Sequence, residues 1–98
     1  MALKIVWTKR AAAGYDRIVN YLLENWSEKE IVDFITDTDR FFDILAEHPE
    51  ILRKTSKYKN VYRGPINPLT ILTYRVKPRL NQIELLNIRG ARQKPLKA

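Results

Sequence analysis

The stretch that decides the fold is YLLENWSEKE, residues 21–30, because it joins two amphipathic patterns through a short link. Ser27 followed by Glu30 has the spacing of a capping box. In this motif the serine hydroxyl accepts a hydrogen bond from the amide three residues on, and the carboxylate accepts one from the serine amide. A helix therefore begins after Ser27. Since only residues 25–27 separate the two patterns, we expect two antiparallel neighbouring helices.

On both sides of this link, apolar side chains recur every three or four residues, which is the pattern of a helix that buries one face. The first helix is predicted to start after Thr8, a favourable capping residue, and Gly14 weakens it without ending it. The second helix should end near Glu47, because Pro49 disfavours helical geometry at His48. The predicted apolar positions are Tyr15, Ile18, Leu22 and Trp26, then Ile31, Phe34, Ile35, Phe41, Phe42 and Leu45.

Outside the helices the pattern changes to that of strands. Leu3, Ile5 and Trp7 alternate with Lys4, Val6 and Thr8 in the period-2 pattern of a half-buried strand. Three later segments are rich in Ile, Leu, Val, Tyr and Thr. The later segments span residues 58–64, 69–76 and 82–88, with a basic connector at 52–57 before them and links at 65–68 and 78–81 between them. Both links are of hairpin length.

The resulting order, β-α-α-β-β-β, indicates an α+β fold in which a helical hairpin packs on one face of a mainly antiparallel sheet. With 98 residues the chain is long enough for one hydrophobic core. We therefore expect a single domain over residues 1–98, with a basic tail at about 90–98.

Charge is distributed unevenly along the chain. The net charge of +7 divides into +3 for residues 1–23, −7 for residues 24–50 and +11 for residues 51–98. The last segment holds twelve Lys or Arg and one acid, Glu84. Concentrated positive potential attracts phosphates and carboxylates, so this half is predicted to bind a polyanion or an acidic protein surface. A basic surface that serves only solubility is the alternative.

Composition excludes several classes of protein. The absence of cysteine excludes thiol catalysis and iron-sulfur clusters, and it favours a reducing, cytoplasmic location. No apolar run approaches the roughly 18 residues of a membrane span, and residues 1–7 are too short for a signal peptide. With His48 as the one histidine, neither a Ser-His-Asp triad nor a two-histidine metal site can be assembled. No cofactor or metal is predicted, and Glu30, Asp33 and Asp37 are interpreted as a solvated helix face.

The strands instead supply arginine, lysine and tyrosine. Tyr58, Tyr62 and Tyr74 are interleaved with basic residues that include Arg63 and Arg75. A guanidinium group can form two parallel hydrogen bonds to a phosphate, and a phenol ring can stack on a base. The combination therefore suits RNA or single-stranded nucleic acid. It also suits an acidic protein groove, and some of the tyrosines fit an ordinary amphipathic sheet.

Nearly the whole chain resembles the RelE/ParE toxins of bacterial type II toxin-antitoxin systems, sometimes called plasmid stabilisation proteins. The order and spacing of several segments carry the resemblance together. These segments are residues 5–11 (IVWTKRA), 21–26 (YLLENW), 48–50 (HPE), 69–76 (LTILTYRV) and 83–95 (IELLNIRGARQKP). The resemblance implies a small bacterial toxin held inactive by a cognate antitoxin, with which it can form a hetero-oligomer, and the expected order of elements agrees with the order reached above.

The family's branches act on different targets. The RelE branch cleaves messenger RNA on the ribosome with Arg, Lys and Tyr, whereas the ParE branch inhibits DNA gyrase and needs no nuclease site. Here Ile71 stands where the nuclease branch commonly has arginine, and Arg89 replaces the histidine often found before its final basic run. These departures favour a ParE-like gyrase inhibitor. A RelE-like ribosome-dependent endoribonuclease is the first alternative, and a non-catalytic basic RNA-binding protein is the second.

Candidate site residues follow from the resemblance and from the charge. Target contacts are expected from Tyr74, Arg75, Arg89, Arg92 and Lys94. If the chain is a nuclease, its catalytic residues are expected among Tyr74, Arg75 and Arg92. The site should need no metal.

Overall fold

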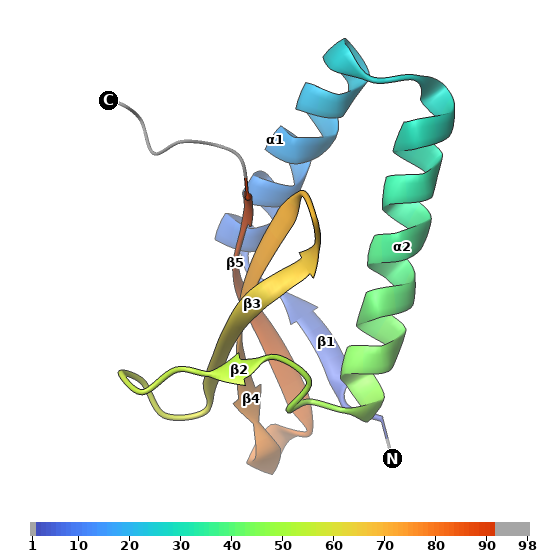
Figure 1. Cartoon of the computed structure of the whole chain (residues 1–98). Coiled ribbons are helices and arrows are strands. Elements are labelled where there is room, and N and C mark those ends of the chain that lie inside the picture. Colours follow the sequence, from blue (N-terminus) through green and yellow to red (C-terminus); the bar gives the residue numbers. More distant parts are fainter. Residues whose placement is uncertain (1, 92–98) are drawn as a thin grey trace.

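Two helices lie against one face of a five-stranded sheet in the computed structural model, which describes residues 2–91 (Figure 1). The elements in chain order are β1 (Lys4–Trp7), α1 (Lys9–Asn25), α2 (Glu28–Glu47), β2 (Arg53–Lys54), β3 (Val61–Asn67), β4 (Thr70–Lys77), the short 3₁₀ helix η1 (Pro78–Leu80) and β5 (Gln82–Gly90). The strand order is β1-β5-β4-β3-β2, in which β1 and β5 are parallel and the other neighbours are antiparallel. The predicted α+β fold is confirmed.

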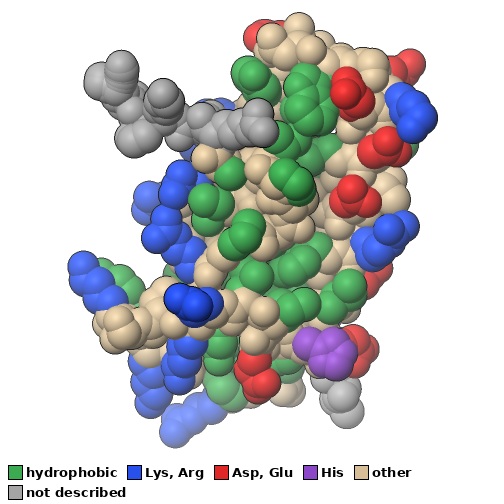
Figure 2. All heavy atoms as spheres, in the orientation of Figure 1, with side chains coloured by type: hydrophobic (Ala, Val, Ile, Leu, Met, Phe, Trp, Pro, Cys, Tyr) green, Lys and Arg blue, Asp and Glu red, His purple; other side chains and the backbone are tan. Residues whose placement is uncertain are grey.

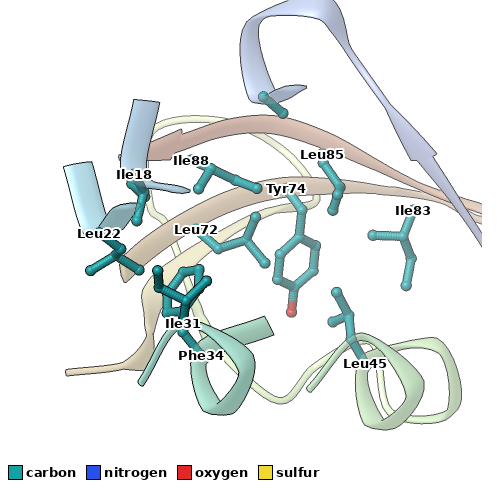
Figure 3. Close-up of a cluster of buried hydrophobic side chains, with 11 residues drawn as sticks. Ile18, Leu22, Ile31, Phe34, Leu45, Leu72, Tyr74, Ile83, Leu85 and Ile88 are labelled. Carbon is teal, nitrogen blue, oxygen red and sulfur yellow. The ribbon is translucent and has the colours of Figure 1, made fainter. Parts of the chain in front are cut away.

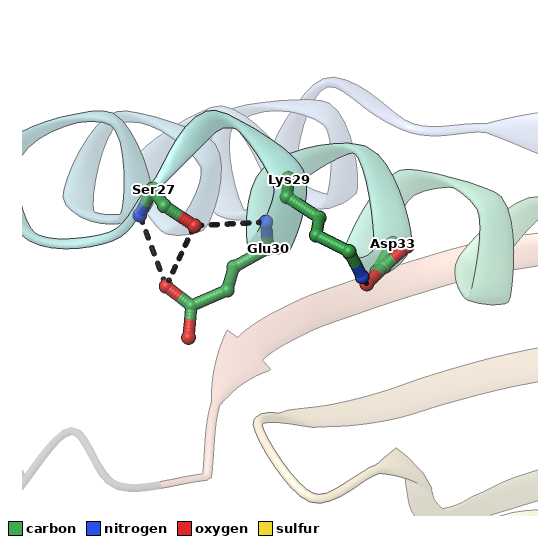
Figure 4. Close-up of polar contacts among 4 residues, drawn as sticks. All are labelled: Ser27, Lys29, Glu30 and Asp33. Carbon is green, nitrogen blue, oxygen red and sulfur yellow. Dashed lines mark hydrogen bonds and ion pairs between the residues drawn. The ribbon is translucent and has the colours of Figure 1, made fainter.

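The helical hairpin forms as the capping signals predict. The Thr8 hydroxyl accepts a hydrogen bond from the Ala11 amide at 3.1 Å and begins α1. At the start of α2 the Glu30 amide donates to the Ser27 hydroxyl at 3.3 Å, while the Ser27 amide donates to the Glu30 carboxylate at 3.0 Å (Figure 4). At the other end His48 is the C-cap, and its amide donates to the Ile44 carbonyl at 2.8 Å. Each helix end thus satisfies backbone groups that the helix itself leaves unpaired.

The core fills the space between the helical hairpin and the sheet (Figure 3). Its buried side chains come from both helices and from the two central strands. They are Ala11, Ile18, Leu22, Ile31, Phe34, Leu45, Leu72, Tyr74, Ile83, Leu85 and Ile88. Within residues 2–91, neither helix is long and apolar enough to cross a membrane.

Two strand boundaries differ from the sequence-based expectation. The strand expected at residues 58–64 begins at Val61 and continues to Asn67, through Pro65. Pro65 is tolerated because β2 pairs with only two residues of β3, so the rest of β3 is an edge, where proline is allowed. The link before β4 is therefore Pro68 and Leu69, and the Asn67 side-chain oxygen accepts a hydrogen bond from the Leu69 amide at 2.9 Å.

Strand β2 was not predicted, because two exposed residues carry no periodic signal. It lies inside the expected basic connector, where Arg53 pairs with Arg63 and Lys54 pairs with Tyr62. The parallel pairing of β1 with β5 was not specified either, although it agrees with a mainly antiparallel sheet. It places β1 at one edge of the sheet and makes β5 an interior strand.

Gly14 has a more specific role than the helix weakening expected from its propensity. It is buried where α1 crosses β5, and a Cβ at this position would overlap the Ile88 carbonyl oxygen and lie 3.0 Å from the carbonyl carbon. Both atoms belong to backbone, so they cannot move aside as a flexible side chain would. Only glycine allows α1 to approach β5 this closely.

We predict that Gly14→Ala lowers the free energy of unfolding by about 3 kcal/mol, because the added methyl group overpacks a backbone contact. Helix propensity alone predicts the opposite sign, a stabilisation of about 1 kcal/mol. Chemical denaturation of the two proteins measures the difference. The exposed neighbour Ala13→Gly serves as the control and should cost about 1 kcal/mol; a stabilised Gly14→Ala protein would contradict the packing argument.

Candidate functional site

The sheet face opposite the helices carries the candidate site. Along β4 the side chains of Thr70, Leu72 and Tyr74 are buried on the helix side, and the alternate residues point the other way. Thr73 and Arg75 therefore share the outer face. Cross-strand pairing extends this face to β3, since Arg63 pairs with Thr73 and Val61 pairs with Arg75.

A β-bulge in β5 brings the last arginine onto the same face. Tyr74 pairs with Leu85 whereas Thr73 pairs with Asn87, so Leu86 is the extra residue. Before the bulge Ile83 and Leu85 face the helices, and after it Ile88 and Gly90 do so. Regular alternation from Leu85 would have placed Asn87 and Arg89 on the helix side. The bulge reverses the phase and places Arg89 on the outer face, as bulges at functional sites often re-aim a side chain.

The helix start is tied to this bulge. The Thr8 hydroxyl, besides capping α1, donates a hydrogen bond to the Leu85 carbonyl at 2.7 Å. The Thr8 amide donates to the same carbonyl at 3.3 Å. These contacts place the first turn of α1, which carries Arg10, beside the bulged part of β5.

Together these elements form an open cleft of about 390 Å³. We call it the arginine cleft, and its charged side chains come from α1, β3, β4 and β5. They are Arg10, Arg63, Arg75 and Arg89. Tyr58, which is 54% exposed, stands at the rim, while the buried Val61 and half-buried Leu86 contribute an apolar floor.

Among the residues that the structure describes, 2–91, no acidic side chain lines the arginine cleft. Glu84 is opposite Arg75 in the register, yet its carboxylate pairs with Lys77 Nζ at 3.2 Å. Most other acids lie along α2, where Asp33 and Asp37 pair with Lys29 and Arg40 on the exposed helix surface. Figure 2 shows this separation: red side chains follow α2, and most blue side chains gather along the other side of the molecule. Among residues 2–91, none of the cleft arginines forms an ion pair.

A second hollow of about 370 Å³ adjoins the first and shares Arg63 with it. Arg53 and Lys54 from β2 line it, together with Ile71 from β4. Arg53 pairs directly with Arg63 across the strands. The basic surface therefore continues across all the strands from β2 to β5.

The structure separates the predicted site residues into three groups. Arg75 and Arg89 lie together in the arginine cleft, and their role as target contacts stays a prediction. Arg92 and Lys94 lie outside the described residues. Tyr74 is fully buried on the helix side, so the expectation that it contacts the target is corrected: its side chain has no surface to offer.

Tyr74 instead supports the sheet from beneath. Its hydroxyl donates a hydrogen bond to the Pro49 carbonyl at 2.6 Å, which ties β4 to the segment after α2. Its ring stacks on that of Tyr62, with centroids 5.3 Å apart and planes 9° from parallel. Burial is the largest cause that raises the pKa of Tyr74 from 10.0 to about 12. The phenol therefore stays protonated near neutral pH and cannot act as a base there.

Sequence reasoning missed Arg10, and it noted Tyr58 and Arg63 in the strand pattern without including them among the expected target contacts. Arg10 lies far away in the chain and joins the cleft only because α1 starts beside β5. Arg63 had a usable signal, since it belongs to the same alternating strand pattern as Arg75. The adjacent apolar pair Leu85-Leu86 was a signal for the bulge.

The described side chains of the cleft can bind anions but lack a pair for proton transfer. Guanidinium groups are effectively always protonated, so the four arginines supply donors and positive charge and no proton acceptor. Arg75 and Arg89 are half-buried, which strengthens their attraction for an anion relative to full exposure. Among residues 2–91, no cluster of three or more His, Asp or Glu side chains is placed to hold a metal ion.

Comparison with protein families assigns the chain. The profile described as "ParE toxin of type II toxin-antitoxin system, parDE" matches residues 5–95, which is most of the sequence. The chain belongs to the ParE toxin family. It is thus a toxin of the RelE/ParE type, as the resemblance in the sequence indicated. No curated protein sequence matches it.

Solved structures share the toxin's fold. A chain of the chromosomal ParDE system from P. aeruginosa superposes with a TM-score of 0.72 at 19% identity, covering 91% of this chain and 96% of that one. The isolated E. coli RelE toxin gives 0.62 at 14% identity, with 96% and 89% covered. A chain of the archaeal RelE-RelB complex from Pyrococcus horikoshii gives 0.58 at 17% identity, with 96% and 100% covered. At these identities the likeness shows the fold alone.

We predict that Tyr74→Phe lowers the free energy of unfolding by about 1–2 kcal/mol at neutral pH, because the Pro49 carbonyl loses its donor. The difference between the two proteins should shrink as the pH rises from about 10 to about 12. The folded-state pKa of Tyr74 lies above its ordinary value, so its stabilising effect is present below pH 10 and is lost toward pH 12. Urea denaturation of both proteins across this range tests the prediction; equal stability at neutral pH would contradict it.

Proposed function

We propose that this toxin inhibits DNA gyrase and that a cognate antitoxin neutralises it. The family match over residues 5–95 supports a ParE-type target. The observation that carries the choice over RNA cleavage is the composition of the arginine cleft, whose described lining has four guanidinium groups and neither a carboxylate nor a histidine.

Cleavage of RNA requires a group that removes the proton from the 2′-hydroxyl and one that protonates the leaving oxygen. The expected nuclease residue Tyr74 is buried, and its pKa is raised rather than lowered. His48 is the C-cap of α2 and does not line the arginine cleft. A surface that binds without reacting fits an inhibitor that acts by occupying its target.

The antitoxin is proposed to contribute an acidic segment that covers the arginine cleft. The described lining of the cleft contains no acid, so its four guanidinium groups can pair with carboxylates from another chain. A segment that is disordered when free can wrap such a concave, basic surface, although it loses conformational entropy on binding. Neutralisation would then result from direct competition for the residues that contact the target.

We predict that the purified toxin inhibits gyrase supercoiling and that Arg75→Gln/Arg89→Gln weakens the inhibition at least tenfold. The variant removes two charge-assisted contacts from the centre of the cleft while leaving two arginines. Supercoiling of a relaxed plasmid at increasing toxin concentration measures the effect. Arg17→Gln/Arg40→Gln, which removes the same charge from the exposed helix surfaces, is the matched control and should inhibit like the original chain.

Mapping of transcript ends after brief induction in bacteria provides the opposing readout. Intact messages together with gyrase inhibition agree with the proposal. Cuts at fixed codon positions, with supercoiling unaffected by the purified toxin, would assign the chain to the ribosome-dependent endoribonucleases instead.

A further inference from the structure

The arginine cleft and the adjoining hollow form one continuous basic surface, which we call the arginine face. It comprises Arg10, Arg53, Arg63, Arg75 and Arg89. We propose that the arginine face binds the sugar-phosphate backbone of duplex DNA, so that the toxin recognises gyrase with DNA bound to it. The role assigned to gyrase rests on the proposed function, whereas the DNA contact rests on the features that follow.

The shape of the surface suits an extended polyanion. Two hollows of about 390 and 370 Å³ share Arg63, and together they cross β2, β3, β4 and β5. Arg63 and Arg75 are diagonal neighbours in the register, a relation that places residues about 7–8 Å apart. A single small anion would engage one or two of these side chains, whereas a phosphodiester backbone presents a row of charges that can engage them all.

The arrangement is unfavourable unless an anion is present. Arg53 and Arg63 are directly paired across β2 and β3, and like charges in this relation destabilise a sheet. Among residues 2–91, no carboxylate pairs with either arginine or with Arg75 or Arg89. The chain contains enough acids to neutralise them, but most of these acids lie on α2. A polyanion would relieve the repulsion at all of these positions.

The position of the aromatic rings favours backbone contacts over contacts with unstacked bases. Proteins that bind single strands provide several exposed rings on which successive bases stack. Here Tyr62 and Tyr74 stack on each other on the helix side, so they offer no such platform. Within residues 2–91, Tyr58 at the rim is the one aromatic residue that lines the cleft. Duplex DNA, whose bases remain paired, is therefore a better match than an unpaired RNA strand.

An acidic protein segment, such as the one proposed for the antitoxin, can compete for the same charges, but the arginine face gives it few apolar anchors of its own. Tight protein interfaces concentrate their energy in aromatic and apolar anchors buried in well-packed pockets. The apolar floor of the cleft is small, because Val61 is already buried and Leu86 is half-buried. Charge-charge contacts with the guanidinium groups dominate what the arginine face can offer, which is the mode of phosphate recognition.

The test is fluorescence anisotropy of a labelled 20-base-pair DNA duplex titrated with the full-length toxin. If about four phosphates are neutralised, the affinity falls with a slope near −3.6 in a log-log plot against salt. Raising the salt from 50 to 200 mM should then weaken binding about a hundredfold. An affinity that does not change with salt would overturn the proposal.

Two variants that lose the same number of positive charges distinguish DNA binding by the arginine face from an effect of net charge alone. Arg63→Gln/Arg75→Gln/Arg89→Gln should lose most of the affinity and reduce the salt slope to about −1. Arg17→Gln/Lys29→Gln/Arg40→Gln removes three charges from exposed positions on α1 and α2, and should bind DNA within about threefold of the original chain. Circular dichroism melting verifies that both variants fold. Equal binding by the two variants would overturn the proposal.

Competition experiments identify the ligand class. Unlabelled duplex should displace the probe more effectively than a single-stranded RNA of the same charge or a poly-glutamate peptide of the same charge. Stronger displacement by the RNA would assign the face to RNA, and stronger displacement by the peptide would assign it to an acidic protein; either result overturns the proposal.

Supercoiling assays on the same variants keep the two proposals distinguishable. Loss of DNA binding together with loss of gyrase inhibition supports both. If the triple cleft variant no longer binds DNA but inhibits gyrase fully, the inference fails and the cleft is not the gyrase-binding site, while gyrase itself remains the target. If the toxin binds DNA through the arginine face and never inhibits gyrase, the proposed function fails while the DNA contact stands.

Discussion

The close packing of α1 against β5 is the constraint on which the rest of the molecule depends. Gly14 lets the helix backbone approach the Ile88 carbonyl, and Thr8 fixes the start of the same helix to the Leu85 carbonyl at 2.7 Å. These two contacts lie on either side of the bulge at Leu86. They hold β5 in the register that points Ile88 toward the helices and Arg89 away from them. The hydrophobic core and the arginine cleft are thus two consequences of one backbone arrangement.

The molecule separates opposite charges rather than pairing them. The acids of α2 form exposed pairs with Lys29 and Arg40, and such surface pairs contribute little to stability. The arginines of the sheet lack even this small stabilisation from ion pairs. A sequence that alternated acidic and basic residues across the strands would have provided it. The outer face of the sheet is therefore less stable than it would be with paired charges. Proteins break favourable local rules of this kind chiefly at functional sites.

How much the sequence revealed depends on whether the deciding signal is local. Ser27 and Glu30 are three residues apart, so the start of α2 could be predicted almost to the residue. Arg75 could likewise be selected as a candidate from the local pattern of its own strand. Arg10 could not be found, because its place in the cleft depends on contacts between Thr8 and a strand more than seventy residues later. The exposure of Tyr74 was misjudged because strand alternation does not by itself show which face of the sheet is buried. Tyr74 and Arg75 are adjacent in the chain, so their side chains lie on opposite faces.

The same scaffold carries both branches of the family, so the fold alone does not determine the target. What distinguishes them must lie in the few side chains that face the cleft. Thr73 and Asn87 occupy its centre in one cross-strand row with Arg63, and neither side chain ionises. A proton acceptor at either position would stand beside guanidinium groups able to bind a phosphate, which is part of what cleavage requires. Under the proposed function, threonine and asparagine at these positions let the same arginines bind a polyanion without cleaving it. If the proposed function holds, the difference between binding and cleavage on this sheet depends on the side chains at such positions, because the backbone fold is shared.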